Sequence, residues 1–198
     1  MNQWTHIAVV RNGTTVTLYK DGVSASTGNI GNGVVNTTSS PVYVGGYAAL
    51  TPFSGYISNF RFVKGTALYT SAFTPSTTPL TAITNTSLLT LQYNGGANNS
   101  GIIDNSTFNN IITRTGNTTQ GSFSPFSQTG WSTYFNGSTD YMYSSGGAGV
   151  GGTSFGYGTG DFTWECWIHP LSSTWTSGNF YICDHGSNGG VMQYNANV

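Results

Sequence analysis

The stretch WTHIAVVRNGTTVTLYKDG, residues 4–22, decides the fold class. Its first part is rich in β-branched and aromatic side chains, and Asn12-Gly13 follows as a strong hairpin signal. Apolar and polar residues then alternate up to a second turn signal, Asp21-Gly22. Residues 4–28 are therefore predicted to form a three-stranded antiparallel meander with two tight turns.

The rest of the chain repeats this pattern of short strands and turns. Gly55 is expected to mark a bend or a close backbone approach within its strand. Residues 65–83, rich in Thr, Ser and Pro with at most one helical turn, are expected to form a surface strap or linker. No stretch shows sustained helical periodicity, so the sequence predicts an all-β sandwich of two antiparallel sheets. Further strands are predicted over residues 41–46, 53–64, 87–93, 131–143, 161–170, 179–183 and 191–197.

The chain is nearly uncharged. Its 198 residues include five Lys and Arg and six Asp and Glu, for a net charge of −1, while Phe, Tyr and Trp make up 14%. So few cations cannot neutralise a phosphate backbone, and no apolar run is long enough for a transmembrane helix. Neither nucleic acid nor membrane is therefore an expected partner. A charge this close to zero also gives weak repulsion between copies, which favours assembly.

Three motifs resemble the laminin-G-like domains of the concanavalin A-like lectin/glucanase superfamily. The hairpin of residues 4–22 resembles the central signature of these domains, FSGYISNFR at residues 53–61 resembles a late strand, and DFTWECWIHP at residues 161–170 resembles an early one. The resemblance implies a concanavalin A-like jelly-roll β-sandwich. The segment GTALYTSAFTP, residues 65–75, further resembles a version found in bacteriophage virion proteins, especially tail-associated ones.

These motifs occur in a different order from that of the family. Residues 1–82 resemble the C-terminal half of a laminin-G-like domain, and residues 83–198 resemble the N-terminal half. Either the chain is cut across two tandem domains, or the halves pack together as one circularly permuted sandwich. Each half alone would expose an apolar sheet face and unpaired edge strands. We therefore expect the halves to pack as one sandwich.

Because the superfamily includes glycoside hydrolases, paired carboxylates need a direct test. Asp161 and Glu165 share one face of a strand but lie roughly 13 Å apart, beyond the separation of about 5–9.5 Å that glycosidase pairs require. An approach of Glu165 to Asp184 across strands is left open, because the sequence does not set the register. The protein is expected not to be an enzyme, with a glycoside hydrolase as the least favoured alternative.

A ligand-binding site is expected in the loops. Trp175 lies in a Ser/Thr-rich loop with no obvious strand to bury it, and an exposed ring can stack on a sugar. The loop DHGSNGG, residues 184–190, concentrates a carboxylate, an imidazole and an amide that suit a sugar, or Ca²⁺ through Asp184. A plain polar turn is the alternative for this loop, and a turn leading into a core strand is the alternative for Asp140-Tyr141. The candidate ligand-binding residues are Trp175, Asp184, His185, Asn188 and Tyr141; Ca²⁺ is the one cofactor considered.

The remaining histidines and the cysteines have structural interpretations. His6 is expected to pack on a tryptophan at the edge of the core, and His169, just before Pro170, is expected at the surface. Cys166 and Cys183 are too few for a disulfide framework, and a buried free thiol is the default expectation for Cys166.

These observations favour a non-catalytic carbohydrate-binding or adhesion module of a phage or microbial surface protein, located outside the cell or on the virion. Its partners would be a glycan or host cell-surface component, together with neighbouring virion subunits or tandem domains. The alternative is a structural spacer in a virion tail or fibre. Since one fold hosts many functions, an exposed aromatic residue beside Asp184 would favour binding, and a flat surface of Thr and Ser would favour the spacer.

Overall fold

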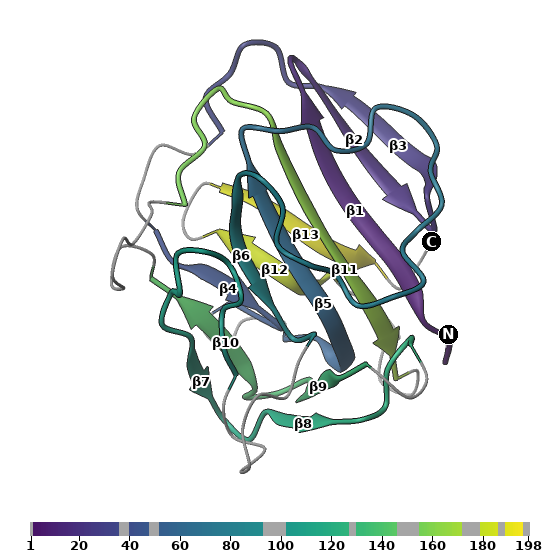
Figure 1. Ribbon diagram of the computed structural model, residues 1–198, viewed down its shortest axis with the longest axis vertical. Helices are drawn as coiled ribbons and strands as arrows, with labels where there is room; N and C mark the ends of the chain where they lie inside the picture. The colour runs from purple at the N-terminus through teal and green to yellow at the C-terminus, as the bar shows by residue number, and fades with distance from the viewer. Residues whose placement is uncertain are drawn as a thin grey trace.

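The computed structural model is an all-β sandwich (Figure 1). It describes residues 2–35, 40–47, 52–92, 102–126, 130–145, 155–171, 179–185 and 189–195. Within these ranges thirteen strands form two antiparallel sheets, and no helix occurs. The predicted fold class is confirmed.

Sheet A is the layer at the front of Figure 1. Its strands follow one another in the order β3 (Val23–Asn29), β2 (Thr15–Lys20), β1 (Thr5–Asn12), β11 (Phe162–Pro170), β5 (Ser54–Lys64), β9 (Ser132–Asn136) and β8 (Thr119–Gly121). An eighth strand, β6 (Thr86–Thr90), pairs with the later part of β5, on the same side of β5 as β9.

Sheet B lies behind sheet A in the same view (Figure 1). Val42 and Val44 of its middle strand point into the core, where they meet the inward side chains of sheet A. The order across this sheet is β13 (Gly189–Asn195), β12 (Asn179–His185), β4 (Val42–Val44), β10 (Tyr141–Ser144) and β7 (Thr113–Thr115).

Strand β11 lies in the later part of the sequence, but in sheet A it is placed between β1 and β5, which come from the early part (Figure 1). Its inward residues Phe162, Trp164, Cys166 and Ile168 belong to the core, as the alternation predicted. The ring centroid of Trp164 lies 4.6 Å from that of Phe62 on β5. The core therefore includes apolar side chains from both parts of the chain. The likeness of each part to half of a laminin-G-like domain stays a prediction.

Both predicted hairpins form, but one turn lies one residue later than expected. Asp21 and Gly22 have φ angles of 49° and 80° and form the second turn as predicted. In the first hairpin Asn12 still pairs with Thr15, so Gly13 and the residue after it form the turn. At the tip of this hairpin the Gly13 N–H donates to Asp161 Oδ1 at 2.7 Å, which ties the turn to the residue before β11.

Residues 65–83, the strap, cross the outer face of sheet A in front of β1, β11 and β5 (Figure 1). The predicted surface strap is confirmed, and it contains no helical turn. Its Tyr69 and Phe73 rings stack at 3.6 Å over a buried cluster that includes Tyr19. The Phe73 N–H donates to the Gly22 carbonyl at 2.9 Å, and a Cβ on Gly22 would clash with the Phe73 backbone. Only glycine therefore allows this close approach.

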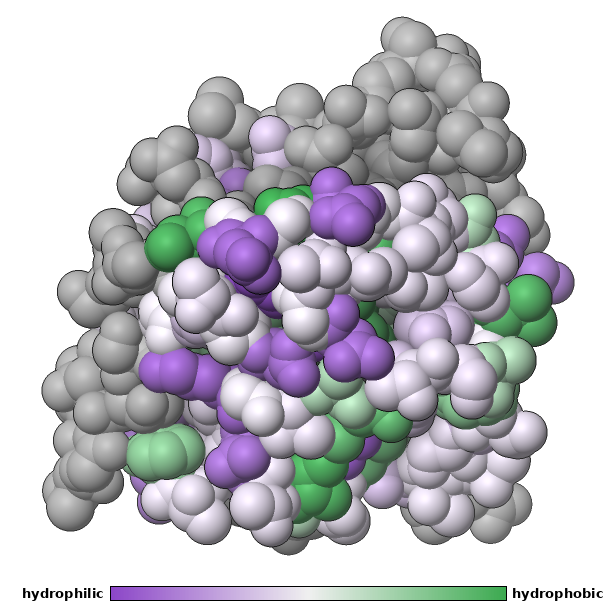
Figure 2. All heavy atoms as spheres, turned by 90° about the horizontal axis from the view of Figure 1, so that it is seen from above, coloured by the Kyte–Doolittle hydropathy of each residue, from purple (hydrophilic) through white to green (hydrophobic). Residues whose placement is uncertain are grey.

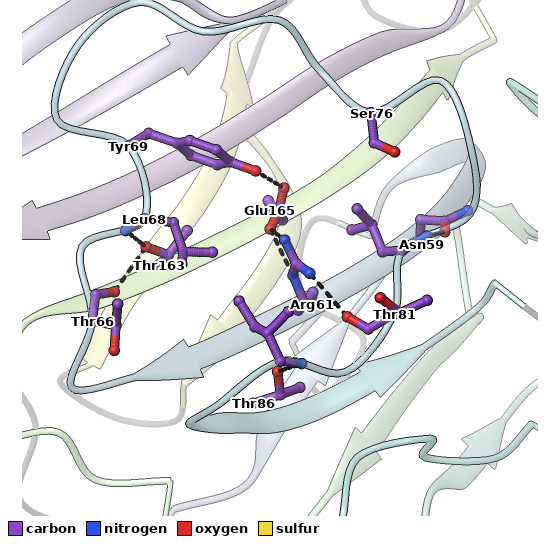
Figure 3. Close-up of polar contacts among 12 residues, drawn as sticks. Asn59, Arg61, Thr66, Leu68, Tyr69, Ser76, Thr81, Thr86, Thr163 and Glu165 are labelled. Carbon is purple, nitrogen blue, oxygen red and sulfur yellow. Dashed lines mark hydrogen bonds and ion pairs between the residues drawn. The ribbon is translucent and has the colours of Figure 1, made fainter.

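Beneath the strap lies a buried ion pair between Arg61 and Glu165 (Figure 3). Arg61 Nε and Nη2 donate to Glu165 Oε1 at 2.8 and 2.5 Å, and the Tyr69 hydroxyl donates to Oε2 at 2.8 Å. His6 Nε2 lies 3.2 Å from Oε2, while Arg61 Nη1 donates to the Thr81 carbonyl. Three strands and the strap thus meet at one carboxylate.

The charge of Glu165 is matched by these partners. Burial alone would raise its pKa, but the His6 hydrogen bond and the Arg61 charge outweigh burial and hold the pKa below its usual value. The ring of His6 also packs at 5.3 Å against Trp167. His6 therefore has a structural position, as expected.

Replacing Glu165 by Gln is expected to lower the free energy of unfolding by about 3–5 kcal/mol, because Arg61 would keep a buried charge without its partner. Urea denaturation at neutral pH measures the loss. The exposed Lys20 provides the control, since Lys20→Gln should change stability by less than about 0.5 kcal/mol. Equal effects of the two substitutions would contradict the structural role of the ion pair.

Candidate functional site

The carboxylates of Glu165 and Asp184 do not form a pair. Cys166 on β11 and Cys183 on β12 both face the core, so the neighbouring Glu165 and Asp184 point away from it on opposite sides of the sandwich. Glu165 is enclosed beneath the strap, whereas Asp184 lies on sheet B beside Tyr43. The approach of Glu165 to Asp184 that the sequence left open does not occur.

Four tyrosines form an aromatic patch on the outer face of sheet B, which we call the tyrosine face. Its members are Tyr43, Tyr47, Tyr141 and Tyr143, and all four are partly exposed. Tyr43 is central, with ring centroids 5.0 Å from Tyr47, 6.1 Å from Tyr141 and 5.8 Å from Tyr143. The four rings are therefore in mutual contact through Tyr43.

Strand pairing explains why these rings gather. Tyr43 on β4 is directly opposite Tyr143 on β10 and also opposite Asp184 on β12. Residues directly opposite each other project from the same face of a sheet. The intervening pair, Val44 and Met142, points into the core. A row of Asp184, Tyr43 and Tyr143 therefore crosses three strands on the outside.

Asp184 gives this face a group that titrates near neutrality. Its side chain is only 6% exposed, and this burial raises its pKa to about 6, partly offset by a hydrogen bond from the His185 backbone. Burial also raises the pKa of Tyr43, and its tyrosine neighbours and Asp184 raise it further. The site is close to neutral at acidic pH and gains one negative charge above about pH 6.

Of the other predicted site residues, the structure describes only His185, and its side chain does not lie on this face. His185 is fully buried, its ring lies 5.6 Å from that of Tyr157, and its Nε2 is 3.0 Å from the Ser40 carbonyl. Burial lowers its pKa to about 4. The alternation of β12 turns His185 into the core, away from the tyrosine face, and its predicted contact with a ligand stays a prediction. Trp175 and Asn188 lie outside the described residues.

Sequence reasoning found Tyr141 and Asp184 but missed Tyr43, Tyr47 and Tyr143. The signal was present in the spacing: Tyr141 and Tyr143 are two residues apart in one strand, which places them on one face. What the sequence could not supply was the pairing of β10 with β4, which adds the central Tyr43.

Two further expectations concern buried groups. Cys166 and Cys183 are both free and buried, and burial raises the pKa of each thiol, so the expected free thiol at Cys166 is confirmed. The expected surface position of His169 is wrong. Its side chain is buried among the rings of Trp4, Tyr56 and Phe123.

Within the described part of the chain, no group of three or more His, Cys, Asp and Glu side chains is arranged to hold a metal ion. The same part contains no helix with the length and apolar character needed to cross a membrane.

Replacing Asp184 by Asn is expected to stabilise the protein above about pH 6. Because the Asp184 pKa is higher in the folded state, folding takes up a proton between about pH 4 and 6, and the wild-type protein loses stability over that range as the pH rises. The difference between variant and wild type should be near zero at pH 4 and reach about 1–3 kcal/mol at pH 7.

Urea denaturation of both proteins across this pH range measures the difference. His185 acts in the opposite direction, because its lowered pKa makes stability rise as the pH rises from about 4 to 6.5. That contribution is common to both proteins and cancels in the difference. A variant less stable than wild type at pH 7 would show that the Asp184 charge stabilises the fold.

Comparison with known proteins supports the fold. Residues 1–71 match a laminin-G family model described as the concanavalin A-like lectin/glucanases superfamily. The matched part includes β1 to β5, and hence Tyr43 and Tyr47, but not β10 or β12. A search of curated proteins and of solved structures finds no match. The family match and the two antiparallel sheets together agree with a concanavalin A-like sandwich.

Proposed function

We propose that the protein is a non-catalytic carbohydrate-binding module and that the tyrosine face is its contact surface. The observation that carries the proposal is the cluster of four partly exposed rings around Tyr43, beside Asp184, on the outside of sheet B. This is the arrangement expected for binding, rather than the flat Thr and Ser surface expected for a spacer.

Tyrosine suits a sugar for physical reasons. The negative face of its ring attracts the weakly positive C–H groups of a sugar, while its hydroxyl exchanges hydrogen bonds with sugar hydroxyls. The side chain has few rotatable bonds, so little conformational entropy is lost on binding. The ring-to-ring contacts of Tyr43 with its neighbours restrict the rings further.

The ligand is expected to be rich in hydroxyls and not strongly anionic. Arg114 on the neighbouring β7 pairs with the inward-facing Met142 and donates to the Thr118 carbonyl, so it does not join the tyrosine face. Figure 2 shows another part of the surface, where most described residues are pale and strongly hydrophilic or hydrophobic residues occur in small groups. The described residues of the tyrosine face, with Asp184 beside them, therefore offer rings, hydroxyls and one carboxylate to a ligand, and no cation.

The roles of the carboxylates support a binding function over catalysis. Glycoside hydrolysis needs two carboxyl groups facing one bond. Glu165 is engaged in the ion pair, and four aspartates accept backbone N–H groups, which leaves Asp184 alone on the tyrosine face. The aspartates and the N–H groups they accept are Asp21 with His6, Asp104 with Leu89, Asp140 with Asn117, and Asp161 with Gly13.

We place this module outside the cell or on a virion surface, where a host glycan is the partner. The sequence resemblance to phage tail-associated proteins supports that context. The alternative, a structural spacer, is favoured by the edge strand β3, whose residues Val23–Asn29 are all exposed and uncharged. Such an edge can pair with a neighbouring subunit.

A glycan array tests the proposal. The wild-type protein is expected to bind one or more neutral glycans saturably, equally with Ca²⁺ and with chelator. Tyr143→Ala should weaken binding at least about tenfold, which corresponds to about 1.4 kcal/mol, because it removes one ring of the contact surface.

Tyr143→Phe is the matched control, since it keeps the ring and removes only the hydroxyl. It should retain most of the affinity, and circular dichroism should show that both variants are folded. Absence of saturable binding to any glycan would reject the proposal and favour the spacer. Equal binding by wild type and Tyr143→Ala would reject the tyrosine face as the contact surface.

A further inference from the structure

A groove of about 530 Å³ lies on the other side of the sandwich from the tyrosine face, at the β8–β9 end of sheet A. Tyr56 on β5 is directly opposite both Tyr134 on β9 and His169 on β11. These side chains project outward, because the next pair along, Ile57 and Thr133, faces the interior. The lining residues that matter for the argument are Tyr56, Asn117, Phe123, Tyr134, Asn136 and Asp140.

Three aromatic rings line one part of this groove. The ring centroid of Tyr56 lies 5.2 Å from that of Tyr134 and 4.8 Å from that of Phe123. Phe123 is 47% exposed, which is unusual for so large an apolar side chain. His169 packs at 4.9 Å behind Phe123 and supports it from the buried side. The rings are therefore both accessible and held in place.

The polar part of the groove is fixed by one buried carboxylate. Asp140 Oδ1 accepts the Asn117 N–H at 2.8 Å, and Oδ2 accepts the Asn136 N–H at 3.2 Å. Asn136 Oδ1 in turn accepts the N–H groups of Ser138 and Thr139 at 2.8 and 2.9 Å. Two turns that border the groove are thus tied to a single point, and the site is preorganised.

We propose that this groove is a second carbohydrate-binding site, specific for uncharged glycans. None of its described lining residues is a Lys, Arg or His, so the lining offers no cation to a uronic acid, sialic acid or phosphate; the exposed Arg114 is not among them and donates to the Thr118 carbonyl. Asp140 is only 1% exposed and uses its oxygens within the protein, so it adds negative charge without offering a free ligand. Rings beside amides and hydroxyls match the C–H faces and hydroxyls of a neutral sugar.

The position of the groove has a consequence for function. The strap covers the outer face of sheet A over Glu165 and Arg61 but stops short of Tyr134, so the groove remains open. With the tyrosine face on sheet B, one domain holds two sites on opposite sides. This part of the inference rests on the proposed function. When glycan units joined in one ligand or on one surface occupy both sites, binding at the first site raises the effective concentration at the second, and the overall affinity increases.

The test is a two-dimensional ¹H–¹⁵N NMR titration with maltohexaose, cellohexaose and chitohexaose as neutral probes and oligogalacturonate as the anionic control. At least one neutral probe is expected to shift the amide signals of Asn117, Tyr134 and Asn136 in a saturable way. Oligogalacturonate should not shift them. Tyr134→Ala should abolish these shifts, and Asn117→Ala should weaken binding several-fold, because each removes one lining group.

Tyr143→Ala is the matched control for the groove, because it alters only the other face and should leave the shifts at Asn117 and Tyr134 unchanged. The spectrum of each variant also reports whether it is folded. Shifts confined to the tyrosine face would overturn the proposal that the groove binds glycans and would leave the proposed function standing. Shifts confined to the groove would support it and reject the tyrosine face. Absence of shifts at both sites with every neutral probe would overturn both proposals.

Discussion

The ion pair between Arg61 and Glu165 is the constraint on which the arrangement of sheet A depends. It joins β5 to β11, and the same carboxylate contacts His6 on β1 and Tyr69 on the strap. A buried charge without its partner is strongly destabilising, so this register of β11 is favoured over slipped ones. With Glu165 facing outward, Trp164 faces the core, and the strap closes over the charged cluster.

That same arrangement determines where a ligand can reach the protein. The strap seals the part of the outer face of sheet A that contains the charged cluster, so Glu165 is buried there and bonded to Tyr69. Among the described residues, partly exposed aromatic rings gather around Tyr43 on sheet B and around Tyr134 on sheet A. Both have polar neighbours but no exposed cation among the residues that form them. Part of the charge is buried, as at Arg61 and Glu165, whereas Lys20, Asp21 and Arg114 are exposed.

Much of the fold was predictable because the strand signals are local. Alternation placed Trp164 and Cys166 in the core, and the turn chemistry of Asp21-Gly22 was correct. The first hairpin turn lies one residue later than predicted, and its Gly13 N–H is bonded to Asp161, which is distant in sequence. The candidate site was predicted only in part. Tyr141 and Asp184 both lie beside Tyr43, and the pairing that brings these strands together cannot be predicted from the local alternation of residues. His185 was expected in a surface loop because it is polar and precedes a glycine-rich segment. Strand β12 instead extends to His185, and its side chain is buried.

A crystal structure of the protein with the highest-affinity glycan from the array would test the central claim most directly. The account predicts a sugar ring stacked against Tyr43 or Tyr143, with carbon atoms within about 4–4.5 Å of the aromatic ring, and hydroxyls near Asp184. A bound glycan that contacts none of the four tyrosines of this face would contradict it.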